Sequence, residues 1–152
     1  MSKRRLLELI RVLRNVEAQI EDAKKHGRKS PFRMNNWCQV LTDYNEAVCG
    51  TAACAAGHAA SDGWFRSSGL RLEVSRWRGL VPKFSIEFRG ASDEAAVRRF
   101  FGLSVDDTED VFFPMSYEAR GILSEDITPQ HVIDRVNILL RRKPRKRATA
   151  RA

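Results

Sequence analysis

The run from Val48 to Ala60 constrains the fold more than any other stretch, because almost every side chain in it is smaller than leucine. Alanine is the best helix former, and Gly50 followed by Thr51 is typical of a helix start at which the threonine hydroxyl caps the first turn. A glycine inside a helix costs about 1 kcal/mol relative to alanine, so Gly57 indicates that a neighbouring backbone approaches closely. We therefore predict a thin helix at the centre of the fold.

An amphipathic helix is predicted from Lys3 to about His26, with Gly27 as its stop. Its apolar residues recur every three or four positions, with charged residues between them, and therefore form one buried stripe. They are Leu6, Leu9, Ile10, Leu13, Val16, Ile20 and Ala23. Three large apolar residues follow and predict an extended segment that docks on the core. They are Phe32, Met34 and Trp37.

Two later runs, residues 70–75 and 84–89, alternate apolar and polar residues with the period of two that half-buried strands show. They predict an antiparallel hairpin. The connection from Arg76 to Pro82 is longer than a two-residue turn, so the spacing leaves the register of the two strands open.

Short helices are predicted in the last third of the chain. Residues 94–101 and 105–113 form two of them, with Gly102 ending the first and Ser104 capping the second. A final helix begins at Pro129, which occupies the favoured first position, and Thr128 before it can cap the helix. Together these patterns predict an α+β fold with a single domain: a long N-terminal helix and a small-residue central helix packed on a β-hairpin, closed by short C-terminal helices.

The formal net charge of +8 is concentrated at the C-terminal end. Residues 141–152 contain seven basic and no acidic residues, and removing them leaves 20 basic against 19 acidic residues. We expect residues 1–140 to form the domain and residues 141–152 to be a disordered basic tail. Such a tail could contact phosphates without reading sequence, or it could be a solvated terminus that aids solubility. The residues expected to contact nucleic acid are Arg141, Arg142, Lys143, Arg145, Lys146 and Arg147.

Composition also narrows the cellular setting. No apolar run approaches the roughly 18 residues that a membrane helix needs, and the charged N-terminal segment lacks the apolar centre of a signal peptide. The chain contains three cysteines, an odd number that favours free thiols in a reducing compartment over a disulfide framework. We expect a cytoplasmic protein without membrane contact.

A series of short strings resembles a family of small uncharacterised proteins from bacteria and their phages. The strings are Phe32-x-Met34-x-x-Trp37, Cys49-Gly50-Thr51-x-x-Cys54-x-Ala56-Gly57, Phe101-Gly102-Leu103-Ser104, Phe112-Phe113-Pro114 and Ile127-Thr128-Pro129. The resemblance covers about three-quarters of the chain, and its CGTxxCxAG string is distinctive. It implies a bacterial or phage setting and no established activity.

A zinc site is one alternative role for the cysteines. Cys38, Cys49, Cys54 and His58 have the spacing C-x10-C-x4-C-x3-H, and on a helix the last two would share one face. The alanines between them suit a regular buried helix rather than a loop-rich zinc finger. Cysteine is also among the most often buried residue types, so packing thiols are the favoured interpretation.

A catalytic cysteine is a second alternative. At a helix start, Cys49 would lie near the positive end of the helix dipole, which lowers the pKa of a thiol. The general base would be His131, with Asp134 beside it, in the order Cys, His, Asp of papain-like folds. An exposed histidine on the first turn of a helix is the competing interpretation.

DNA reading by a helix-turn-helix is a third alternative, because the two short helices around Gly102 have the required lengths. The second helix would bring four acidic residues close to the negatively charged DNA, and this repulsion argues against base readout. They are Asp106, Asp107, Glu109 and Asp110.

Weighing these patterns, we expect a non-enzymatic intracellular binding protein that needs no cofactor. It would bind an unidentified protein partner and would contact nucleic acid nonspecifically through its tail. A cysteine-dependent enzyme with Cys49 as nucleophile and a zinc-stabilised module remain the alternatives.

Overall fold

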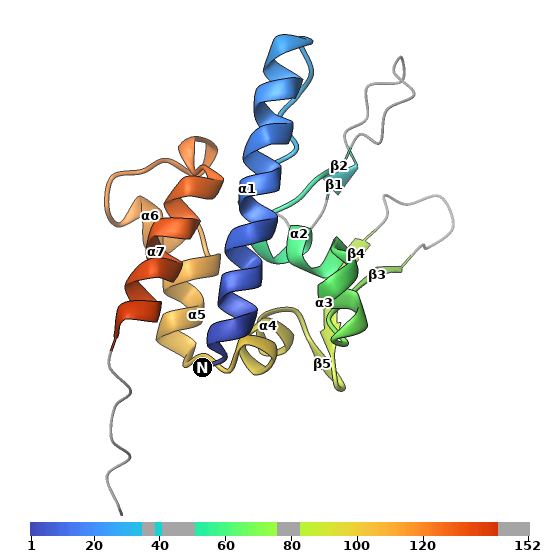
Figure 1. Ribbon diagram of the computed structural model, residues 1–152, viewed down its shortest axis with the longest axis vertical. Helices are drawn as coiled ribbons and strands as arrows, with labels where there is room; N and C mark the ends of the chain where they lie inside the picture. The colour runs from blue at the N-terminus through green and yellow to red at the C-terminus, as the bar shows by residue number, and fades with distance from the viewer. Residues whose placement is uncertain (35–38, 41–50, 76–82, 143–152) are drawn as a thin grey trace, which may run out of the picture.

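The computed structural model describes residues 1–34, 39–40, 51–75 and 83–142 (Figure 1). Its helices are α1 (Lys3–Lys25), α2 (Ala55–Ser61), α3 (Gly63–Ser67), α4 (Asp93–Phe101), α5 (Val105–Phe112), α6 (Met115–Glu118) and α7 (Pro129–Arg141), with a 3₁₀ turn at Ser124–Asp126. Its strands are β1 (Gln39–Val40), β2 (Thr51–Ala52), β3 (Arg71–Ser75), β4 (Lys83–Phe88) and β5 (Ala91–Ser92). The predicted α+β class with a long N-terminal helix is confirmed.

Helix α1 lies in the middle of the fold and contacts other helices on both sides. It packs antiparallel to α7 on one side and contacts α2 on the other (Figure 1). Its predicted apolar stripe faces the core, and Leu6, Leu9 and Leu13 are fully buried. The helix stops as predicted, because Gly27 adopts a φ of +65° that other residues rarely take.

The central helix is buried as predicted, but its predicted start was wrong. Thr51 lies in β2 and caps no helix, while α2 begins at Ala55. Strand β2 pairs with β1, and the next residue, Ala53, bridges to Phe32, so the backbone before α2 is engaged in extended pairing. The N-cap is Cys54, whose Sγ accepts a hydrogen bond from the Gly57 N–H at 3.5 Å. The alanines of α2 are all buried in the core; they are Ala55, Ala56, Ala59 and Ala60.

The segment after α1 docks on the core as predicted. Phe32 is 5% exposed and Met34 is 3% exposed, whereas Trp37 lies outside the described residues. Two backbone hydrogen bonds join this segment to Ala53. The Ala53 N–H donates to the Pro31 carbonyl, and the Arg33 N–H donates to the Ala53 carbonyl.

The predicted hairpin is present, and it gains a third strand. Strands β3, β4 and β5 form an antiparallel sheet in that order, with Leu72 opposite Ile86. Helix α4 packs on β4 and β5. The turn between β4 and β5 consists of Arg89 and Gly90, whose φ values are +48° and +72°. Positive φ at both positions is typical of a type I′ turn, which usually contains asparagine and glycine. Because arginine is not typical of this position, the sequence did not indicate the turn or strand β5 after it.

The C-terminal helices follow the predicted caps. Gly102 ends α4 with a φ of +65°, and the Ser104 side chain caps α5. Thr128 caps α7 through a capping box whose other member is His131. Among the helices of the described residues, none has the length and apolar composition that crossing a bilayer would take.

Candidate functional site

The two predicted zinc ligands that the structure describes have other partners. The Nε2 atom of His58 lies 2.9 Å from the Pro31 carbonyl oxygen, which can only accept, so Nε2 carries the proton. The His58 ring stacks on Phe32, with centroids 6.0 Å apart, and burial lowers its pKa. Cys54 caps α2 and is 1% exposed. Within the described ranges, no three His, Cys, Asp or Glu side chains are grouped as a metal site would require. Cys38 and Cys49 lie outside those ranges.

Of the predicted catalytic residues, His131 and Asp134 are each bonded to another side chain or backbone group, and Cys49 lies outside the described residues. The helix α2 begins six positions after Cys49, so the helix-dipole argument for that thiol was wrong. The Nδ1 atom of His131 accepts a hydrogen bond from the Thr128 N–H at 3.1 Å, and the Asp134 carboxylate accepts one from Gln130 at 2.7 Å. His131 is therefore bonded to the N-cap of α7, and Asp134 to a residue of its first turn.

Helices α4 and α5 are joined by a short turn as predicted, and two of the four acidic side chains of α5 form ion pairs within the protein. Asp107 pairs with Arg142. Asp110 pairs with Arg120 at 2.8 Å and with Arg135 at 3.1 Å. These contacts fasten α5 to α7, which agrees with a structural role for α5 rather than base readout.

The predicted nucleic-acid-binding tail begins at the end of α7. Arg141 and Arg142 are exposed there, and part of the charge of Arg142 is balanced by Asp107. The other four predicted residues, Lys143, Arg145, Lys146 and Arg147, lie outside the described ranges.

A charge asymmetry inside the domain was missed by sequence analysis. Residues 1–103 contain 18 basic and 11 acidic side chains, whereas residues 104–134 contain one basic and eight acidic ones. The two imbalances cancel in the sum, which made the domain look neutral. Counting charges separately in successive segments of the sequence would have found both imbalances. In the structure, three of the basic side chains of residues 1–103 form a cluster.

Three arginines from distant parts of the chain meet where α1, the β4–β5 turn and α4 come together. We call Arg5, Arg89 and Arg99 the arginine cluster. The Arg5 guanidinium lies 4.1 Å from the ring centroid of Phe100 and 5.6 Å from that of Phe88. The Arg89 guanidinium lies 5.2 Å from the same Phe88 ring, and Arg99 donates a hydrogen bond to the Arg89 carbonyl at 3.0 Å. The ring of the buried Phe88 thus has two guanidinium groups near it, one from α1 and one from the β4–β5 turn.

The cluster carries uncompensated positive charge. Burial, and secondarily the charge of Arg89, lowers the pKa of Arg5, yet an arginine keeps its proton in proteins. Within the part of the chain that the structure describes, no carboxylate forms an ion pair with any of the three arginines. Like charges kept close without a counter-charge are the arrangement that an anion stabilises.

Backbone strain coincides with the cluster. Arg89 is a residue with a side chain held at a positive φ, which costs on the order of 1 kcal/mol or more outside glycine. Asparagine would fit this turn position better. The strained arginine therefore indicates a role for its guanidinium beyond folding.

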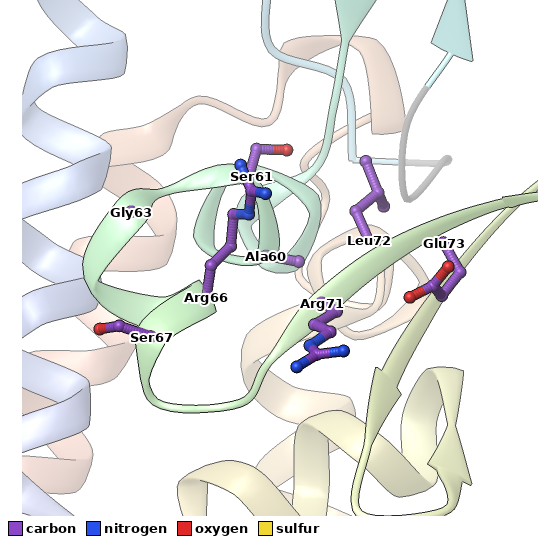
Figure 2. Close-up of a pocket in the computed structure, with 8 residues that line it drawn as sticks. All are labelled: Ala60, Ser61, Gly63, Arg66, Ser67, Arg71, Leu72 and Glu73. Atoms are coloured by element: carbon purple, nitrogen blue, oxygen red, sulfur yellow. The ribbon is translucent and has the colours of Figure 1, made fainter.

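A second basic feature is a hollow of about 750 Å³ that lies between β3 and the corner at which α2 meets α3 (Figure 2). Arg66 of α3 and Arg71 of β3 line it, together with Glu73. Arg4 extends the basic surface towards α3, because its guanidinium lies 5.5 Å from the ring centroid of Trp64.

Comparison with known proteins adds no family to this picture. No protein-family model matches the chain, and neither a curated protein nor a solved structure matches it.

Proposed function

We propose that this chain is a non-enzymatic, cytoplasmic binding protein of bacterial or phage type that contacts the phosphate backbone of nucleic acid nonspecifically. The single observation that carries the proposal is that the guanidinium groups of Arg5 and Arg89 both lie over the Phe88 ring, and that no carboxylate of the described residues forms an ion pair with either. A phosphate oxygen between them would relieve their repulsion and accept their N–H donors.

The geometry favours positioning over sequence reading. A guanidinium stacked on a buried ring has lost much of its freedom before binding, so less entropy is lost when it meets a phosphate. The helix that could enter a groove, α5, carries four acids and no basic residue, and two of the acids are paired within the protein. The basic tail would add further phosphate contacts to those of the arginine cluster, each of them sequence-independent.

The test measures binding of a fluorescein-labelled DNA duplex by anisotropy across a salt series. Arg89→Asn removes one guanidinium and supplies the residue that the turn prefers, so it should weaken binding while leaving thermal stability unchanged or higher. The slope of log K against log salt should become shallower by about 0.9 for each phosphate that the variant no longer neutralises. Arg120→Gln is the matched control, because it removes the same charge from the acidic part of the chain.

The tail is tested by deleting residues 143–152, which keeps the Arg142–Asp107 pair. The deletion should make the salt slope shallower still without changing the melting temperature, because it removes none of the described residues. If Arg89→Asn and Arg120→Gln bind alike, the arginine cluster is not a phosphate site. If the combined deletion and Arg89→Asn variant binds like the parent, the proposed function is wrong.

A further inference from the structure

The outer edge of β3 is a second surface whose geometry indicates a partner, independently of the proposed nucleic-acid contact. Strand β3 is at the end of the order β3-β4-β5. Among the described residues, the backbone of Arg71–Ser75 forms hydrogen bonds with no segment other than β4. Within the part of the chain that the structure describes, one row of its N–H and C=O groups therefore has no partner strand.

The hollow described above runs along this edge. Three consecutive residues of β3, Arg71, Leu72 and Glu73, line it (Figure 2). Neighbouring side chains of a strand point to opposite faces of the sheet, so a hollow that all three line must border the edge of the strand. Helix α2 packs against both β3 and β4, which places it over the sheet rather than beyond the edge. The hollow therefore lies between this edge and the corner formed by α2 and α3.

The residue order along this edge is self-complementary. When a strand pairs antiparallel with its own copy around Leu72, Arg71 lies directly opposite Glu73 of the second copy, and Glu73 lies opposite Arg71 of the second copy. Both are on one face of the sheet, where opposite charges in directly opposed positions attract. A parallel pairing in register would instead set Arg71 beside its own copy.

The other face of the same pairing is apolar. Val74 shares a face with Leu72, and its apolar side chain is 46% exposed. In the antiparallel register, Val74 is a diagonal neighbour of Leu72 in the second copy, so pairing would cover both side chains.

We propose that β3 pairs antiparallel with β3 of a second copy, forming a two-fold symmetric dimer with a continuous six-stranded sheet. Helix α3 precedes β3 by only three residues, so the antiparallel arrangement places the two α3 helices at opposite ends of the paired strands. The charges of Arg71 and Glu73 fix both the partner and the register.

The experiment is sedimentation velocity over a concentration series of four proteins. The parent should dimerise. Arg71→Glu and Glu73→Arg should each be monomeric, because each places like charges opposite each other across the two-fold axis. An equimolar mixture of the two single variants should dimerise again, since one edge is then entirely acidic and the other entirely basic. The double variant with both changes should also recover the dimer.

Two controls separate charge pairing from misfolding. Arg14→Glu reverses an exposed charge on α1 and should leave the dimer intact. Circular dichroism checks the fold of each variant. This check is needed because, within one copy, Arg71 of β3 also lies opposite Glu87 of β4, whereas Glu73 lies opposite Ser85. A parent that stays monomeric at its highest soluble concentration overturns the proposal and leaves the edge to an acidic peptide or a phosphate ligand. Dimers that persist in both single variants, or a mixture that stays monomeric, overturn it as well.

Discussion

The guanidinium of Arg135 lies 3.4 Å from the centroid of the Tyr117 ring, and this contact joins α7 to α6 inside the fold. Arg135 is only 6% exposed and donates to the Ser116 hydroxyl at 2.7 Å and to the Asp110 carboxylate at 3.1 Å. The Tyr117 hydroxyl donates to the Val111 carbonyl at 2.8 Å. Burial raises the pKa of Tyr117, so its hydroxyl keeps the proton that it donates. Arg135 therefore joins the middle of α7 to the C-terminal part of α5 and to α6.

We expect Arg135→Met to destabilise the protein by about 3 kcal/mol or more, because it leaves buried acceptors without their donor. Arg135→Lys should recover only part of this loss, since an ammonium lacks the planar fork that reaches Ser116 and Asp110 together. Urea denaturation measures both variants. Equal stability of the parent and Arg135→Met would show that the network contributes nothing.

Stability should decline in mild acid because of His58. Its pKa in the folded protein is lowered by burial, with a weaker opposing contribution from the Pro31 hydrogen bond. The native state therefore binds fewer protons than the unfolded state, so stability is complete above the unfolded pKa of about 6.5 and is lost as pH falls through that value. The loss should approach about 1.4 kcal/mol per pH unit until the folded pKa is reached. His58→Gln keeps a donor for Pro31 and should flatten the pH dependence of stability in this range; parallel pH profiles of parent and variant would contradict this.

The centre of the core should not tolerate bulk. Ala56 is fully buried on α2, so Ala56→Leu should cost about 1–3 kcal/mol through overpacking. Ala95 is an exposed alanine on α4 and provides the control, because leucine there has room and nearly the same helix propensity. Thermal melting of the two variants distinguishes them, and a parent-like melt for Ala56→Leu would mean that α2 lies at the surface.

Cys54 should behave as a packing and capping residue. It is 1% exposed, so alkylation of the native protein should be slow, and Cys54→Ala should cost about 1–2 kcal/mol. A structural zinc would instead contribute on the order of 10 kcal/mol in a small domain, and a chelator would then unfold the protein. Thiol titration and metal analysis of the purified protein distinguish the two roles: stoichiometric zinc would overturn the packing role.

The helices and strands that depend on residues close together in the sequence could be predicted from the sequence alone. The spacing of Leu6, Leu9 and Leu13 determined α1, because a helix repeats every 3.6 residues whatever it packs against. Thr128 before Pro129 determined the start of α7 for a similar reason: caps act within one turn. The alternation of residues 70–75 and 84–89 likewise identified β3 and β4.

Features that depend on distant residues were decided only by the tertiary structure. The start of α2 moved to Ala55 because β1 and Phe32 pair with the residues before it. The arginine cluster exists because Phe88 and Phe100 pack against each other, with centroids 5.0 Å apart, and bring Arg5 to Arg89. Local propensity describes a residue and its near neighbours along the chain, whereas these contacts join residues up to 95 positions apart. Their energies arise only when the core is packed, so the sequence determined the elements and the packing determined the surfaces that they expose.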